Sequence, residues 1–155
     1  MSDQSTVASF SHIGVCVSDI ERSKRFYVEA LGFEVGLVYE MEDTINGLLG
    51  IPPKVLMTSL MLHKGSLVVE LIYFREPKPF AVGGLRPMNQ LGLTHLSFTA
   101  QDVDALAARL EEFGGKFLRE TRTVIEMPDA TPAILLFCTD PDGTRIELYK
   151  PSQPL

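Results

Sequence analysis

The chain carries one internal repeat, and this repeat constrains the fold more than any other feature of the sequence. The stretch 10–32, FSHIGVCVSDIERSKRFYVEALG, recurs as 93–115, LTHLSFTAQDVDALAARLEEFGG. One constant offset aligns a histidine, a helix-capping aspartate and a helix-ending glycine: His12 with His95, Asp19 with Asp102, and Gly32 with Gly115. Because three unrelated features coincide at a single offset, we interpret the chain as two copies of one structural unit.

Each copy has the pattern of one helix and four strands. Alternating apolar residues predict a first strand in each copy. The strand is followed by a helix, with an aspartate as its N-cap and a glycine at its end. Three more strands are expected in each copy: 33–39, 57–63 and 67–74, then 116–122, 133–139 and 144–150. The predicted fold class is therefore α+β, with βαβββ modules at 9–75 and 93–150. A linker rich in proline and glycine, 76–92, joins the two modules.

Length and charge limit the classes of function. The chain has 155 residues, which fits one compact domain or two small fused modules. Its net charge is −6 and no basic run exceeds two residues, which excludes nucleic acid and anionic membranes as partners. No apolar run approaches the roughly 20 residues that span a bilayer. The first residues, MSDQSTVAS, lack the basic and apolar regions of a signal peptide, so we expect a cytoplasmic protein.

Local composition predicts several further features. Cys16 and Cys138 lie in apolar strands and are expected to be buried, reduced thiols. The irregular segment 40–56 is expected to form a loop, with a helical turn that Asp43 caps and Gly50 ends. A loop of this length inside a compact domain often covers a binding pocket, so we expect a lid. The remaining irregular segments are expected to be a frayed polar tail and a second loop: 1–8 and 123–133.

Four ionisable residues interrupt the apolar strands, one histidine and one glutamate in each copy: His12 and Glu70, then His95 and Glu147. Strand alternation predicts that they point away from the helices, onto a shared face of the sheet. Two imidazoles and two carboxylates suit a divalent cation such as Zn²⁺, Co²⁺, Ni²⁺, Mn²⁺ or Fe²⁺. Two carboxylates also neutralise such an ion, which lowers the cost of burying it.

Simpler interpretations exist for each of these residues. A single strand histidine is more often a satisfied polar residue than a ligand, and a strand glutamate often faces water. His63 lies beside a turn and is expected to be exposed, and the four methionines of the strands and linker are expected in the core or in a pocket wall. The simpler interpretation of Asp140 and Asp142 is that they form a turn. The fourfold match on a repeat favours the metal site.

Four segments together resemble the vicinal oxygen chelate superfamily, which includes glyoxalase I, methylmalonyl-CoA epimerase, extradiol dioxygenases and bleomycin-resistance proteins. The segments are SHIGVCVSDIERSKRFYVEALGFEV, LVVELIYF, LTHLSFTAQDVDAL and DPDGTRIELYKP. The resemblance covers about residues 9–150 and implies paired βαβββ modules that form a cupped, mixed eight-stranded sheet around a metal. It implies metal ligands at His12, Glu70, His95 and Glu147, a homodimer, and a small-molecule substrate with chelating oxygens.

The ligand set favours one branch of the superfamily, the isomerases, lyases and epimerases near glyoxalase I and methylmalonyl-CoA epimerase. The resemblance implies proton abstraction next to a carbonyl or thioester, with a metal-stabilised enolate. It favours Glu147 as the base, with Glu70 as the competitor. The resemblance does not extend to glutathione binding, because Cys16 and Phe74 stand where glyoxalase I carries arginine and asparagine.

Two alternatives remain open at this point. One is an extradiol-type dioxygenase, although that class uses two histidines and one glutamate. The other is a non-catalytic protein that binds a small molecule, such as a drug. The sequence also leaves open whether the two modules of one chain form the site or whether a second chain contributes.

Overall fold

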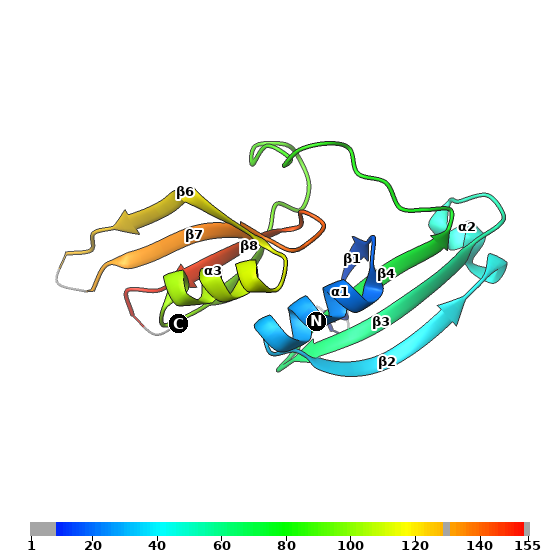
Figure 1. Ribbon diagram of the computed structural model, residues 1–155, viewed down its shortest axis with the longest axis horizontal. Helices are drawn as coiled ribbons and strands as arrows, with labels where there is room; N and C mark the ends of the chain where they lie inside the picture. The colour runs from blue at the N-terminus through cyan, green and yellow to red at the C-terminus, as the bar shows by residue number, and fades with distance from the viewer. Residues whose placement is uncertain (1–8, 129–130, 154–155) are drawn as a thin grey trace, which may run out of the picture.

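The computed structural model describes residues 9–128 and 131–153. The expected polar tail at 1–8 lies outside the described residues. Eight strands form two four-stranded sheets, with the orders β1-β4-β3-β2 and β5-β8-β7-β6 (Figure 1). The first sheet contains β1 (Ile13–Val17), β2 (Glu34–Met41), β3 (Leu56–Lys64) and β4 (Leu67–Glu76). The second contains β5 (Leu96–Thr99), β6 (Lys116–Ile125), β7 (Ala133–Thr139) and β8 (Arg145–Lys150).

The two sheets have the same topology, and the predicted α+β class is confirmed. In each sheet the first strand runs parallel to the last, and the other pairings are antiparallel. The eight strands are divided into two sheets rather than joined in one. β1 is an edge strand of the first sheet, and β5 is an edge strand of the second. Each of these two strands therefore presents one edge without a strand partner within the described chain.

Helices cover one face of each sheet. In the first half, α1 (Ile20–Arg25) continues as a π-helical turn, η1 (Phe26–Ala30). In the second half, α3 (Val103–Glu112) occupies the equivalent place. The predicted caps are confirmed: the Asp19 carboxylate accepts from the Arg22 amide at 3.0 Å, and Asp102 accepts from Ala105 at 2.9 Å. Gly32 follows η1 with a φ of 73°, which only glycine adopts readily.

Several predicted boundaries were wrong. His12 and His95 were expected inside strands, but each lies one residue before a strand, because ladder pairing begins at Ile13 and Leu96. The expected loop at 123–133 starts later, since Thr123 to Ile125 pair with β7.

The loop at 40–56 contains the expected short helical turn, but Asp43 does not cap it. The segment η2 (Asp43–Ile45) is followed by α2 (Asn46–Leu49), and Gly50 ends α2 in the left-handed region. The Asp43 carboxylate instead accepts a hydrogen bond from the Val55 amide at 2.7 Å, which closes the loop across its base.

The two halves of the chain share one core, and the helices form its centre. Figure 1 shows α1 and α3 near the middle of the molecule, with a sheet on either side. Phe33 and Phe98, one from each half, pack edge to face with ring centroids 6.0 Å apart. The Tyr27 hydroxyl donates to Asp140 at 3.1 Å, and both residues are buried.

A polar contact also joins the halves. The Asp142 carboxylate accepts hydrogen bonds from the amide and hydroxyl of Ser18, at 3.0 and 2.5 Å, and from Arg22 at 2.6 Å. Burial tends to raise the pKa of the Asp142 carboxyl, but these hydrogen bonds and the Arg22 charge lower it overall below its usual value.

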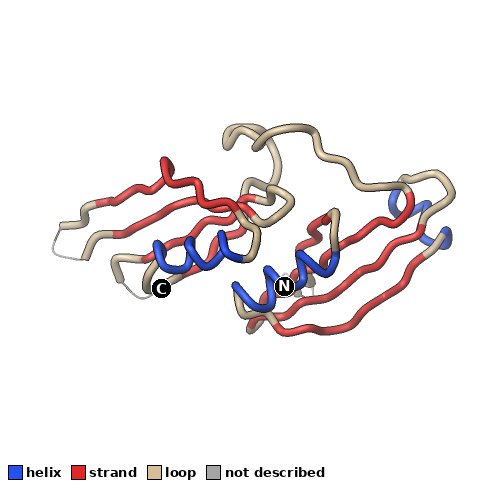
Figure 2. The backbone as a smooth tube through the Cα atoms, viewed as in Figure 1, coloured by secondary structure: helices blue, strands red, loops and turns tan. Residues whose placement is uncertain are grey.

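The segment between the two sheets is irregular and open to solvent. Figure 2 shows it as a long loop that runs from the end of β4 to the start of β5. Phe80, Val82 and Leu91 in this segment are exposed. Cys138 is buried as expected, whereas Cys16 is exposed, because it lies on the face of β1 that the helices do not cover. Within the described ranges, no helix is long and apolar enough to cross a membrane.

Candidate metal-binding site

His12 and Glu70 form a pair on the face of the first sheet that the helices leave open. The Nε2 atom of His12 lies 3.1 Å from Oε2 of Glu70, and the glutamate side chain is 13% exposed. The Ser11 hydroxyl lies 2.9 Å from Nδ1 of the same imidazole. The other carboxylate oxygen of Glu70 accepts a hydrogen bond from Ser59 at 2.5 Å. Both oxygens of Glu70 therefore have partners.

His95 and Glu147 form a second pair on the other sheet. The Nε2 atom of His95 lies 3.6 Å from Oε2 of Glu147, and the Thr94 hydroxyl lies 3.0 Å from Nδ1. Ser97 donates a hydrogen bond to the same Oε2 at 2.6 Å. Among the described residues, nothing hydrogen-bonds to Oε1 of Glu147. The His95 ring packs edge-on against Phe137, with centroids 5.4 Å apart.

The register of the strands explains why the two glutamates differ. Ser97 lies opposite Glu147 on β5 and β8, so its hydroxyl reaches the carboxylate directly. Gly14 lies opposite Glu70 at the equivalent place on β1 and β4 and has no hydroxyl to offer. The Glu70 carboxylate is held instead by Ser59 from β3, on its other side. The two pairs thus contain the same types of side chain, but serines from different strands hold their carboxylates.

The His12–Glu70 distance suits adjacent ligands on one cation, and the His95–Glu147 distance is slightly longer than that range. Metal–nitrogen and metal–oxygen bonds of about 2.0–2.2 Å put neighbouring ligand atoms about 3.0–3.5 Å apart. The hydroxyl on each Nδ1 leaves Nε2 directed at the carboxylate, the arrangement typical of second-sphere partners of a ligating histidine. Imidazole and carboxylate are also the donors that borderline divalent ions accept. Each pair therefore fits one half of a metal site.

The two pairs do not meet within one chain. Across residues 9–128 and 131–153, no group of three or more histidine, cysteine, aspartate or glutamate side chains lies close enough to hold a metal. Each predicted histidine is brought to the predicted glutamate of its own half, and the four are not gathered at one point. A complete four-ligand site requires the two pairs to approach each other.

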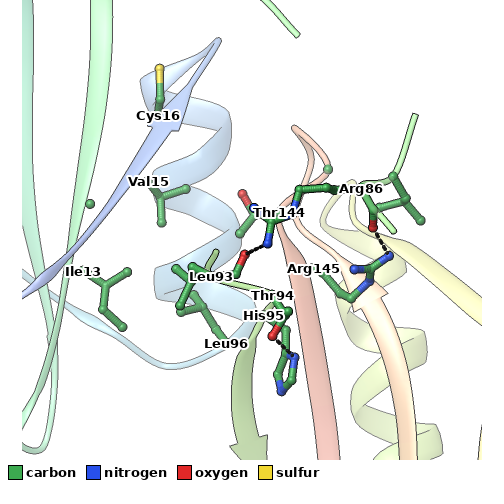
Figure 3. Close-up of a pocket in the computed structure, with 13 residues that line it drawn as sticks. Ile13, Val15, Cys16, Arg86, Leu93, Thr94, His95, Leu96, Thr144 and Arg145 are labelled. Carbon is green, nitrogen blue, oxygen red and sulfur yellow. Dashed lines mark hydrogen bonds between the residues drawn. The ribbon is translucent and has the colours of Figure 1, made fainter. Parts of the chain in front are cut away.

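A cavity of about 280 Å³ separates β1 from the residues that lead into β5. Figure 3 shows Ile13, Val15 and Cys16 on one side, with Thr94, His95 and Arg145 on the other. His95 belongs both to this cavity and to the second pair. None of the loop residues 40–56 lines it, so the expected lid stays a prediction.

The sequence interpretation missed the hydroxyl groups around both pairs. One signal was available for two of them: Ser11 and Thr94 occupy equivalent positions in the repeat, each directly before its histidine. Ser59 had no such signal, because its contact with Glu70 depends on the pairing of β3 with β4.

The geometry defines the class of protein: two sheets of identical topology, each with a histidine–glutamate pair on its open face. The chain belongs to the glyoxalase/bleomycin resistance protein/dioxygenase superfamily, whose family model matches residues 9–148.

Similar proteins span almost the whole chain. The protein YaeR of Escherichia coli (strain K12) is 33% identical over 141 residues, covering 90% of this chain and 93% of YaeR. YwkD of Bacillus subtilis (strain 168) is 34% identical over 142 residues, covering 92% and 96%. Both are uncharacterized. Among solved structures, a glyoxalase family protein from Bacillus cereus has a TM-score of 0.77 at 19% identity, covering 96% of this chain and 97% of its own, which supports the fold.

Proposed function

We propose that the protein is a divalent-metal-dependent enzyme that moves a proton next to a carbonyl or thioester group, as an isomerase, lyase or epimerase does. The observation that carries the proposal is the pairing of each predicted imidazole with a predicted carboxylate, at 3.1 and 3.6 Å. His12, Glu70, His95 and Glu147 would hold the ion. When bound, the cation would polarise the substrate oxygens and so acidify the neighbouring C–H bond.

The number of donors favours this chemistry over the dioxygenase alternative. Four protein ligands leave two positions of a six-coordinate ion, enough for two oxygens of one substrate. The facial-triad oxygenases use three ligands and keep further positions open for O₂. Sustained O₂ uptake with catechols would favour the alternative.

Glu147 is the carboxylate better suited to act as the base. Both oxygens of Glu70 already have partners, from Ser59 and from His12. In Glu147 the histidine and the serine share one oxygen, and the other has no hydrogen-bonding partner among the described residues. A free carboxylate oxygen can take a proton without first breaking a hydrogen bond. Ser97 would meanwhile keep the carboxylate oriented.

We propose further that two copies of the chain complete the site, so that His12 and Glu70 of one copy face His95 and Glu147 of the other. This assembly would bring together the two pairs that one chain keeps apart. The unpartnered edges of β1 and β5 give a second copy a surface to contact.

Mixing two defective variants tests the shared site. His12→Ala and His95→Ala should each lose bound metal, because each removes a ligand from every site. After mixing and refolding, half of the dimers would be mixed, and each mixed dimer would have one intact site. About a quarter of the wild-type metal content should therefore return, measured by elemental analysis after gel filtration. No recovery of metal in the mixed sample would refute the shared site.

Hydrogen exchange in D₂O tests the base. Wild type loaded with Mn²⁺, Co²⁺, Ni²⁺, Zn²⁺ or Fe²⁺ would be screened by NMR against α-hydroxy carbonyl compounds and acyl thioesters. Loss of the C–H signal beside the carbonyl reports proton abstraction. Glu147→Gln keeps an oxygen ligand and should slow exchange by about 100-fold or more while retaining metal. If Glu70→Gln slows exchange and Glu147→Gln does not, the two roles are reversed.

A further inference from the structure

The cavity between β1 and the start of β5 is lined by two arginines, Arg86 and Arg145. Neither has an aspartate or glutamate oxygen within 4.0 Å among the described residues. By contrast, most of the other arginines do: Arg22, Arg25, Arg75, Arg119 and Arg122. Two partly covered positive charges without acidic partners are unusual in a chain of net charge −6.

The partners that these two arginines do have are neutral and leave donors unused. Arg145 donates to the backbone oxygen of Arg86 at 2.9 Å and contacts the sulfur of Met88. Arg86 donates from one nitrogen to the backbone oxygens of Gln90 and Leu93, at 3.2 and 2.6 Å. A guanidinium has five N–H donors, so both groups retain N–H bonds for a ligand.

The surroundings fix both side chains in place. The Arg145 guanidinium lies over the Phe137 ring, 5.6 Å from its centroid. A Cβ atom on Gly92 would lie only 2.9 Å from the Arg86 guanidinium, so the absence of a side chain there lets Arg86 fold against the backbone. Because the Arg86 guanidinium is already held in place, its side chain loses little conformational entropy when a ligand binds.

Three acidic residues of the second half pair with groups other than these two arginines. Asp142 binds Ser18 and Arg22, and Asp140 binds Tyr27. Glu147 is paired with His95. The cavity wall otherwise combines hydroxyl groups, from Thr94 and Thr144, with apolar side chains. The positive charge of the cavity is thus available to an external anion.

We propose that this cavity binds an oxyanion, a carboxylate or phosphate group, through Arg86 and Arg145. Arginine matches both groups through paired N–H···O bonds, and the apolar wall formed by Ile13, Val15 and Leu96 accommodates a short alkyl portion. Because His95 lines the same cavity, the anion is a group of the substrate separate from the oxygens that chelate the metal. This last step rests on the proposed function, whereas anion binding itself does not.

NMR titration of the metal-free protein tests the site separately from any metal chemistry. ¹⁵N-labelled protein, freed of metal by a chelating resin, is titrated with sodium phosphate and, separately, with sodium propionate. Sodium chloride holds the ionic strength constant. We expect saturable shifts of the amides at 13–16, 93–96 and 143–145 with at least one of the two anions. The responding anion identifies the preferred group.

Three variants decide whether the arginines are responsible. Arg145→Gln and Arg86→Gln should each weaken binding by about tenfold or more, because each removes charge-assisted hydrogen bonds. Arg145→Lys keeps the charge and should recover part of the phosphate affinity. Arg119→Gln is the matched control: it removes an exposed arginine outside the cavity and should bind as wild type does. If Arg145→Gln does not fold, Arg86→Gln decides.

Two results would overturn the proposal. One is the absence of saturable shifts at these amides with either anion. The other is equal affinity in wild type, Arg86→Gln and a folded Arg145→Gln. Anion binding without proton exchange on any substrate would refute the proposed enzyme activity and leave the anion site standing.

Discussion

The hydroxyl groups next to the two imidazoles connect individual residues to the proposed metal chemistry. Ser11 and Thr94 lie at hydrogen-bonding distance from Nδ1 of His12 and His95, so Nε2 of each ring is left for the glutamate or for a cation. A hydrogen bond to Nδ1 fixes the orientation of the ring. Thr94 and Ser11 are therefore expected to position the histidines and not to bind metal themselves.

Replacing Thr94 with valine should lower metal affinity. The change keeps the shape of the side chain and removes the hydroxyl, so His95 loses the contact that orients it. Loss of a second-sphere partner typically weakens metal binding by about 10–100-fold. Titration with Co²⁺, followed by visible absorption, measures the effect. Thr99→Val, at an exposed position at the end of β5, is the matched control, and equal affinity in the two variants would contradict the prediction.

At the scale of residues, the sequence predicted the histidines and glutamates that form the two pairs, but it did not predict the other side chains around them. The repeat singled out His12 and His95, and the structure brings each to the glutamate expected in its own half. Their shared role as ligands stays a prediction. The contact of Ser59 with Glu70 could not be predicted, because it requires the register of two strands. Arg86 lies in an irregular segment, where no periodicity indicates the direction of a side chain.

At the scale of elements, Gly115 has a second role beyond the one expected. It helps to end α3 as expected, because its amide donates to the Leu110 oxygen at 2.9 Å, while the positive φ, 91°, falls on Gly114. Gly115 also lies where two elements pack closely. A Cβ atom there would lie 2.5 Å from the Thr139 oxygen and 2.8 Å from the Phe26 ring. The repeat identified the glycine and its place at the helix end correctly, but it gave no sign of the close packing.

Gly115→Ala should therefore destabilise the protein. Neither contact can be relieved without moving a backbone or a buried ring, and overpacking of this kind costs about 1–3 kcal/mol. Urea unfolding followed by far-UV circular dichroism measures the loss. Gly47→Ala is the matched control, because nothing lies within 4 Å of its Cβ position in α2. Alanine there should be neutral or stabilise by up to about 1 kcal/mol. Equal stability of the two variants would contradict the packing role.

At the scale of the whole molecule, the two halves are held together by a shared core and by polar contacts. The sequence predicted two copies of one unit, and Phe33 of the first packs against Phe98 of the second. The sequence did not predict how the halves are arranged, because no local pattern specifies which faces pack. Asp142 illustrates the limit: it was interpreted as a turn residue, and its carboxylate binds Ser18 and Arg22 of the other half.

The stability contributed by Asp142 should depend on pH. Its pKa is lowered in the folded protein, so the folded state favours the charged form. The contribution is present above the ordinary carboxyl pKa and is lost as pH falls through the lowered value. Asp142→Asn should lower the free energy of unfolding by about 1–2 kcal/mol at pH 7 and by less at pH 3.

Urea unfolding at the two pH values measures this difference. Asp104→Asn is the control, because Asp104 pairs with Arg122 on the surface of the second half. Such exposed pairs contribute less than about 1 kcal/mol. A loss of stability for Asp142→Asn that is the same at both pH values would show that its charge is unimportant.

The exposed segment between the sheets has a consequence for how the molecule could be produced. Phe80 and Val82 extend into solvent, and the shared core lies elsewhere, between the helices and the two sheets. A break in the polypeptide chain at this point should therefore leave the fold intact. Co-expressed as separate polypeptides, residues 1–82 and 83–155 should associate and elute together from a gel-filtration column at the size of the intact protein. The two pieces would constitute a split protein that regains its native form by complementation.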